Sequence, residues 1–395
     1  MKQIFYIPIL LLFICGCSPK EIRILNANEI ISIDLNRDID QEVVNNASLF
    51  VQEVLYIPLE TADDFLIGRI NKLIINDGYI YIFDNLSNKI YQFHKSGKFS
   101  NQIGDIGIGP NEYIKIASFS VDQQTGNVFI YCEVKQSLFE YNSAGDLLGI
   151  KKIGLIVTDI LCNNGYSWYY EPRMPNELFF KEIFPDQYRI VEMKDGELKR
   201  TYLPFRYNSN FLRTKLTAAT NQPIYLYDDN IRLADAISNI VYEIKDSVSS
   251  LYAIDFGKYT IPIDFYKNSE NITLRKLKNV QDSKYCKLLD FYEIDKYIYI
   301  TYSVSEYNNL VCSCLYLKED RKAINLGPIW LNNFDNIMMP QIHGVEKEHF
   351  IGYFEADYLK MMITSNSKPI SSNLNELNLN LEDTDNPIIC IVKMK

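Results

Sequence analysis

The amino-acid sequence predicts an all-β chain built from repeated four-stranded antiparallel units, and three observations lead to this expectation. The chain has 395 residues, of which 13% are aromatic, including 29 Tyr and 21 Phe. Short runs of aromatic and β-branched residues, which favour strands, alternate with turn residues such as Gly, Asn and Asp. Segments of this kind recur at a fixed spacing. Because 47% of the residues are hydrophobic, a disordered chain is excluded.

The clearest repeat joins two consecutive units. Three segments of the first unit, at residues 78–83, 90–93 and 97–99, each match a segment that lies 48 residues further along the chain. A further strand, Arg69–Ile75, is expected before the first turn. A four-stranded sheet that recurs about every 40–50 residues is typical of a propeller blade. A solenoid is the structural alternative, although its turns are usually shorter.

Weaker copies of the unit bring the expected number of blades to six. Their strand pairs are Trp168–Tyr170 with Tyr188–Met193, Ile224–Tyr227 with Ile240–Ile244, Tyr297–Tyr302 with Leu310–Leu317, and His349–Phe354 with Ile388–Met394. The last strand reaches the C-terminus without a fourth partner, whereas a strand expected at Phe50–Ile57 has no blade of its own. We therefore expect Phe50–Ile57 to complete the sixth sheet and to close a six-bladed β-propeller over residues 40–395.

Two long polar stretches, residues 261–279 and 357–382, interrupt the strand pattern. Within the second, Tyr358–Ile363 and Leu374–Leu381 could each form a short helix. Surface loops tolerate added length at small entropic cost, so both stretches are expected to be insertions that decorate one face of the ring.

The N-terminal residues predict export from the cytoplasm. Lys2 precedes a nearly unbroken apolar run, Ile4–Ile14. This run is shorter than the roughly 20 residues that cross a bilayer, and it has the length of a signal-peptide core. The alternatives are an ordinary secretory signal and an uncleaved apolar anchor.

The segment Ile14-Cys15-Gly16-Cys17 resembles the bacterial lipobox, in which a cysteine after a small residue is lipidated. The resemblance implies that residues 1–16 are a signal peptide, that Cys17 carries the acyl chains, and that residues 17–39 tether the domain to the membrane. Several acyl chains anchor a protein firmly without a spanning helix. Ser18 in place of Asp resembles proteins sorted to the outer membrane, facing the periplasm or the cell surface.

Charge and cysteine usage narrow the classes of partner. Forty Lys and Arg against 50 Asp and Glu give a net charge of −10, which argues against a general nucleic-acid binder. The cysteines that remain beyond residue 17 show no metal-binding spacing. We expect most of them to be small buried hydrophobic residues, with a disulfide possible but not required.

Several segments resemble the six-bladed β-propeller lipoproteins common in Bacteroidetes. They are the run Tyr56–Thr61 followed by Ile67-Gly68 and Ile80–Asp84, the loop Gly107–Tyr113, which is similar to a GxGPGEY signature, and the ending Asn386-Pro387-Ile388. The signature carries Asn111 in place of a glycine, a mild departure because Asn tolerates positive φ. The blades themselves resemble NHL repeats. The resemblance covers residues 40–395, is closest in the first two blades, and implies a scaffold used for binding.

The loop Gly107–Tyr113 is the sharpest local motif. As a functional loop at the pore mouth, it would present backbone N–H groups near Gly107 and Gly109 together with the carboxylate of Glu112. As a purely structural turn between blades, it would need the same glycines and proline.

A second set of candidates follows a strand. Asp84, Asn85 and Asn88 could supply oxygen ligands for Ca²⁺. Asp and Asn also cap turns through their own backbone, which is the more common arrangement. Asp228, with Asp229 beside it, repeats the pattern, and no other cofactor is expected.

The sequence contains no legible catalytic arrangement. No Ser/His/Asp order and no P-loop is present, and a three-histidine metal site would have to join His94 to the distant His343 and His349. Trp168–Tyr170 could stack on sugar rings or simply pack within a strand.

These features favour a non-enzymatic, lipid-anchored binding module whose ligand is a glycan, a peptide or a partner protein, including an outer-membrane protein. Function in a propeller must be argued from a site, since the fold hosts many activities. The main alternative is a metal-dependent hydrolase or lactonase with its site in the central channel.

Overall fold

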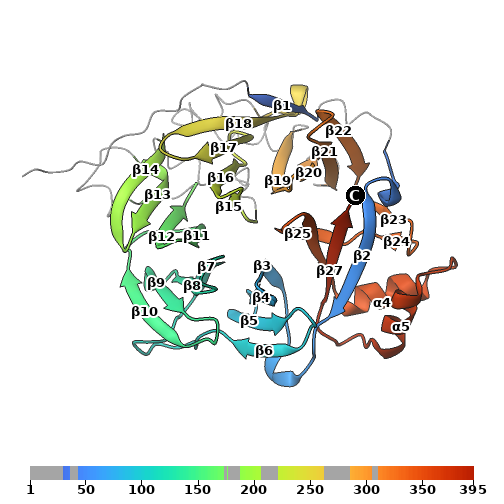
Figure 1. Cartoon of the computed structure of the whole chain (residues 1–395), viewed down its shortest axis with the longest axis horizontal. Coiled ribbons are helices and arrows are strands. Elements are labelled where there is room, and N and C mark those ends of the chain that lie inside the picture. The colour runs from blue at the N-terminus through green and yellow to red at the C-terminus, as the bar shows by residue number, and fades with distance from the viewer. Residues whose placement is uncertain are drawn as a thin grey trace, which may run out of the picture.

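Six sheets stand side by side around a central axis and form a β-propeller, as the sequence predicts (Figure 1). The computed structural model describes residues 30–35, 43–172, 176, 187–205, 221–261, 285–304 and 310–395. The predicted signal peptide, Cys17 and most of the stretch 261–279 lie outside these residues. Five of the sheets have four strands and one has five.

The blades follow one another along the chain, and in each the first strand is innermost (Figure 1). Blade 1 comprises β3 (Ile70–Asn76), β4 (Tyr79–Asp84), β5 (Lys89–His94) and β6 (Phe99–Gln102). Blade 2 comprises β7 (Ile116–Val121), β8 (Val128–Cys132), β9 (Ser137–Tyr141) and β10 (Leu147–Lys152). Blade 3 comprises β11 (Asp159–Asn163), β12 (Tyr166–Tyr170), β13 (Gln187–Lys194) and β14 (Glu197–Phe205).

Blades 4 to 6 include an added fifth strand, the strand that closes the ring and a separate two-stranded hairpin. Blade 4 comprises β15 (Ile224–Tyr227), β16 (Asn230–Asp235), β17 (Ile240–Ile244) and β18 (Val248–Asp255), joined by β1 (Ile31–Asp34). Blade 5 comprises β19 (Cys286–Glu293), β20 (Tyr297–Val304), β21 (Leu310–Leu317) and β22 (Lys322–Gly327). Blade 6 comprises β25 (Gln341–Glu346), β26 (His349–Phe354), β27 (Ile388–Met394) and β2 (Val51–Pro58). The short strands β23 (Leu331–Asn332) and β24 (Ile337–Met338) form a separate hairpin between blades 5 and 6.

The ring is closed by the strand that the sequence analysis assigns to this role. β2 pairs antiparallel with β27, from Val51 opposite Met394 to Pro58 opposite Ile388. The side chain of Asn386 reinforces the junction: its Oδ1 accepts from the amide of Ile67, and its Nδ2 donates to the carbonyls of Glu60 and Phe65. The C-terminal strand β27 and a strand from the N-terminal part of the domain, β2, are therefore held in one sheet.

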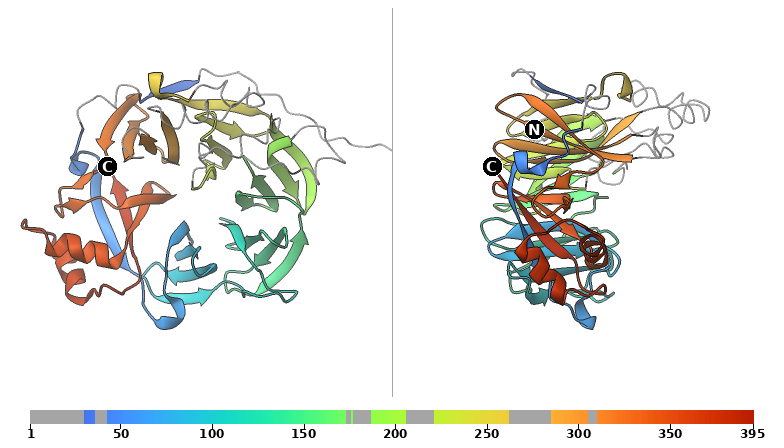
Figure 2. Two further views of the ribbon diagram at one scale, coloured as in Figure 1. Left: turned by 180° about the vertical axis from the view of Figure 1, so that it is seen from behind. Right: turned by 90° about the vertical axis from the view of Figure 1, so that its right-hand side faces the viewer.

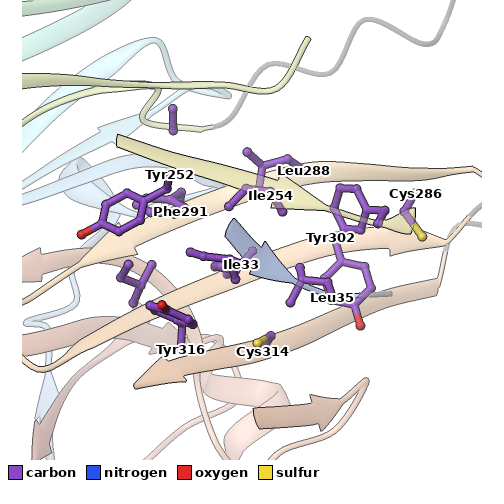
Figure 3. Close-up of a cluster of buried hydrophobic side chains, with 14 of the residues drawn as sticks. Ile33, Leu35, Tyr252, Ile254, Cys286, Leu288, Phe291, Tyr302, Cys314 and Tyr316 are labelled. Atoms are coloured by element: carbon purple, nitrogen blue, oxygen red, sulfur yellow. The ribbon is translucent and has the colours of Figure 1, made fainter. Parts of the chain in front are cut away.

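The strand β1 is a feature that the sequence analysis did not anticipate. It pairs in parallel with β18 at the outer edge of blade 4, with Ile33 opposite Ile254. Ile33 and Leu35 are fully buried among side chains of blades 4 and 5, including Tyr302 and Tyr316 (Figure 3). A four-residue parallel strand has no hairpin and too little alternation to be recognised from sequence.

Hydrophobic clusters fill the spaces between neighbouring blades. One cluster joins Phe83 of blade 1 to Phe119 and Phe139 of blade 2, all three of them buried. Aromatic residues at repeated positions therefore form the contacts between blades, which explains why the repeat is so rich in Tyr and Phe. All six cysteines among the described residues are free; five are buried, and Cys312 is half-buried.

Two α-helices, α4 (Ala356–Thr364) and α5 (Ser372–Asn380), confirm the helical character predicted for the insertion in blade 6. They lie at the rim of the disc beside β2 and β27 (Figures 1 and 2). The short 3₁₀ helices are η1 (Ala47–Leu49), η2 (Asp63–Phe65) and η4 (Gly257–Tyr259). Among the described residues, no helix combines the length and apolar character needed to cross a membrane.

Candidate functional site

The carboxylate of Asp84 is buried and contacts nearby backbone amides. Its oxygens accept hydrogen bonds from the amides of Gly68 (3.0 Å), Arg69 (2.9 Å) and Leu86 (3.0 Å). Three amide donors saturate much of the acceptor capacity of a carboxylate. This arrangement matches the turn-capping interpretation of the sequence motif.

Asn85 and Asn88 also contact protein atoms. The Oδ1 of Asn85 accepts from the Nε of Arg69 at 2.7 Å. Asn88, in the left-handed conformation with φ 59°, accepts from the amide of Ile116 and donates to the carbonyl of Ile114. Asn88 therefore ties blade 1 to blade 2. Calcium binding here remains a prediction, and in the part of the chain that the structure describes, no group of three or more His, Cys, Asp or Glu is placed to hold a metal ion.

The loop that contains Gly107, Gly109 and Glu112 folds back on itself. The Oε2 of Glu112 accepts from the amide of Gly109 at 2.8 Å, and a Cβ at Gly107 would lie only 1.9 Å from that oxygen. The ammonium of Lys135 donates to the carbonyls of Gly109 and Glu112. The two glycines therefore leave the space that the Glu112 carboxylate occupies within the loop.

Asp228 lies in a different setting, at the mouth of the central channel. It occupies the β15–β16 turn with Asp229, and both residues have positive φ. This turn and the corresponding turns of other blades surround a cavity of about 470 Å³. We call it the channel-mouth cavity. Its lining residues are Ile75, Asn76, Asp77, Gln123, Leu226, Tyr227, Asp228, Asp229, Glu293, Asp295, Val345, Glu346, Lys347 and Glu348.

The channel-mouth cavity is acidic, but several of its carboxylates already have partners. Glu293 is buried and accepts from Arg232, Tyr252 and Lys318. Glu346 pairs with Lys95. These contacts fix the walls of the cavity and neutralise part of its charge.

Deeper in the ring, Gln222 crosses the channel. Its Nε2 donates to the carbonyl of Leu73 at 3.0 Å and to that of His343 at 3.2 Å. Gln222 precedes the innermost strand of blade 4, whereas Leu73 and His343 belong to the innermost strands of blades 1 and 6. A hydrolase site in the channel, the alternative expected from sequence, would have to share this space with Gln222.

A second cavity, which the sequence analysis missed, lies between blades 5 and 6. It has a volume of about 400 Å³, within the range of small-molecule sites. We call it the blade 5–6 pocket. Its lining residues are Tyr299, Thr301, Val311, Cys312, Ser313, Pro328, Ile329, Trp330, Met338, Met339, Pro340, Gln341, Tyr353, Phe354, Glu355 and Tyr358.

The pocket is framed by the two irregular connections of this part of the ring. The segment 328–340 runs between blades 5 and 6, and α4 begins directly after Glu355. The hydroxyl of Tyr358, in α4, donates to the Sδ of Met338 in β24 at 2.8 Å. The segment 328–340 and α4 therefore contact each other beside the pocket.

Trp330 combines deep burial with an unused polar group. Its side chain is 4% exposed and stacks on Tyr299, with ring centroids 6.2 Å apart and planes 26° apart. Among the described residues its Nε1 has no hydrogen-bond partner. Buried indole N–H groups usually find an acceptor, so Trp330 is an exception among the buried polar groups of this region.

Glu355 is the charged group of the blade 5–6 pocket. It is half-buried, and the described residues offer its carboxylate no ion-pair partner within 4.0 Å. Burial raises the pKa of Glu355, and the nearby carboxylates of Asp357 and Asp84 raise it further. Sequence patterns do not single out Glu355, because a Glu before a helix is common and most other lining residues of the pocket come from distant segments.

The aromatic run Trp168–Tyr170 is part of the core. All three side chains are buried, and the Nε1 of Trp168 donates to Glu192 at 3.1 Å. Packing within blade 3, one of the two interpretations drawn from sequence, therefore accounts for these residues.

Comparisons with known proteins agree with this architecture. The chain is similar to the solved structure of a candidate exported protein of Bacteroides fragilis, with 19% sequence identity and a TM-score of 0.73. The match covers 93% of this chain and 100% of that one. A member of the DUF4221 family from Bacteroides vulgatus is 11% identical, with a TM-score of 0.51, covering 87% and 97% of the two chains. Both likenesses show the fold. No curated protein matches the chain. The family model described as "Domain of unknown function (DUF4934)" matches residues 30–393, and the chain therefore belongs to this family.

Proposed function

We propose that this protein is an extracytoplasmic binding module, anchored to the outer membrane through a lipid on Cys17, whose ligand occupies the blade 5–6 pocket. The observation that carries the proposal is the pocket itself: a cavity of about 400 Å³ lined by aromatic and sulfur-containing side chains and a few polar groups. Binding sites for small molecules commonly have this composition.

The position of the pocket adds support. It lies where the repeat is most irregular, between the segment 328–340 and α4, and insertions on a rigid scaffold frequently carry function. The blades, which resemble NHL repeats, provide that scaffold. The lipobox-like segment at Cys17 accounts for the anchor.

Two substitutions on the same strand test the site. Val311 lines the pocket and is 45% exposed, whereas the neighbouring Leu310 is 41% exposed and does not line it. Val311→Trp is expected to fill the pocket, while Leu310→Trp is a matched control that introduces the same side chain at the adjacent position. Ligands found by saturation-transfer NMR with a fragment library should lose binding to Val311→Trp and keep binding to Leu310→Trp. Equal binding to both variants would contradict the proposal.

The anchor is tested separately. In bacterial cells, Cys17→Ala should abolish incorporation of labelled palmitate and move the protein from the membrane fraction to the soluble fraction, or leave it unprocessed. Cys15→Ala is the control, because Cys15 precedes the expected cleavage point. Labelling of the Cys17→Ala variant would argue against lipidation at this residue.

A further inference from the structure

The blade 5–6 pocket has an unbalanced charge. Glu355 supplies the one carboxylate among its lining residues, and no Lys, Arg or His lines it. Burying a carboxylate without a partner is costly, and proteins usually offset this cost with an opposite charge. A bound cation would supply the missing charge.

The surroundings of Glu355 strengthen the negative potential. The carboxylates of Asp357 and Asp84 both act on Glu355 as like charges. Arg69, a positive group that acts on the neighbouring Tyr353, has its Nε engaged by Asn85. The charged groups that act on Glu355 are therefore like charges.

The remaining walls suit a cation with an apolar body. Five aromatic side chains line the pocket: Tyr299, Trp330, Tyr353, Phe354 and Tyr358. A cation is attracted to an aromatic face within about 6 Å, and the attraction is strongest for Trp. Met338 and Met339 add polarizable surface that adapts to an apolar ligand.

We infer that the blade 5–6 pocket selects organic amines: a cationic nitrogen that pairs with Glu355, attached to an aromatic or aliphatic body that contacts the aromatic walls. This inference rests on the proposed function, since it names the class of ligand for the same site. A free carboxylic acid is disfavoured by the same charge.

Three probes of similar size separate charge from shape: 2-phenylethylamine, the neutral 2-phenylethanol and the anionic 3-phenylpropionate. Binding to the detergent-solubilised full-length chain is measured by calorimetry. The amine should bind at least tenfold more tightly than the alcohol, and the acid should bind more weakly than the alcohol. Equal affinity for all three would overturn the inference.

Glu355→Gln is the decisive variant, and Asp357→Asn is its control for net charge. Glu355→Gln should reduce amine affinity about tenfold and leave alcohol affinity unchanged, whereas Asp357→Asn should have a clearly smaller effect. Because ionisation of Glu355 is unfavourable in the fold, Glu355→Gln should melt at the same temperature as the parent protein or higher. A loss of amine binding then cannot be attributed to misfolding.

The outcomes separate the two claims. If the alcohol and the amine bind equally and Val311→Trp abolishes both, the pocket is a binding site but the amine selectivity is wrong. If none of the probes binds and Val311→Trp changes nothing in the fragment screen, the proposed function fails as well.

Discussion

The ammonium of Lys72 lies 2.7 Å from the carboxylate of Asp159 and so links the innermost strands of blades 1 and 3. Both side chains are nearly inaccessible, at 6% and 3% exposure. Ser118, on the innermost strand of blade 2, donates to the same Asp159 oxygen at 2.6 Å. Three consecutive blades therefore meet in one buried polar network at the wall of the channel.

Removing one member of this pair should be strongly destabilising. Lys72→Met leaves the Asp159 carboxylate buried without its counter-ion, and we expect the free energy of unfolding to fall by about 3–5 kcal/mol. Urea denaturation followed by circular dichroism measures this change. The double variant Lys72→Met/Asp159→Leu should recover part of the loss, because it removes both buried charges. A single variant as stable as the parent protein would show that the pair is dispensable.

The sequence predicted the parts of the fold that depend on local repetition. The expected strand Arg69–Ile75 corresponds to β3 at Ile70–Asn76, and the expected closing strand Phe50–Ile57 corresponds to β2 at Val51–Pro58. Alternation and turn residues leave a clear pattern in such segments. Closure followed from a simple count of strands in the last blade.

The features that were missed depend on contacts between distant residues. In the sequence Lys72 is indistinguishable from a solvent-facing lysine of an edge strand, and Asp159 lies 87 positions away from it. The blade 5–6 pocket is assembled from β20, β21, the segment 328–340 and the start of α4. No periodicity links these segments, so only the folded arrangement reveals the pocket.

Asn386 should stabilise the junction that closes the ring. It is buried, and its side chain makes three hydrogen bonds with backbone groups of residues 60–67. Asn386→Ala would leave an amide and two carbonyls without partners, at a cost of about 2–4 kcal/mol. Thermal unfolding should show a clearly lower melting temperature, whereas the exposed Asn373→Ala in α5 should change stability by less than about 0.5 kcal/mol. Equal effects of the two substitutions would exclude a special role for Asn386.

The N-terminal strand β1 should stabilise the joint between blades 4 and 5. Ile33 is fully buried there (Figure 3), so Ile33→Ala removes apolar contacts and leaves a cavity. The expected loss of unfolding free energy is about 2–4 kcal/mol. Ser32→Ala, at an exposed neighbouring position of the same strand, is the control. Denaturation curves that coincide for both variants would mean that β1 contributes nothing to the stability of the disc.

His343 should make the protein sensitive to acid. Burial lowers its pKa to about 4, and its Nε2 has no hydrogen-bond partner among the described residues. The ring packs 4.7 Å from that of Tyr353. In the unfolded chain the pKa of a histidine is about 6.5, so below that pH protonation favours the unfolded state.

The direction in which stability changes with pH follows from this difference between the folded and unfolded pKa of His343. The contribution of neutral His343 is fully present above about pH 6.5 and is lost as the pH falls toward 4, which amounts to about 2 kcal/mol between pH 7.5 and pH 5. Urea denaturation over this range should therefore show the free energy of unfolding of the parent protein falling by about 2 kcal/mol relative to that of His343→Phe, because phenylalanine keeps the contact with Tyr353 but cannot be protonated. Since the carboxylates titrate in both proteins, the difference between the two curves isolates His343. A difference that is constant with pH would contradict the prediction.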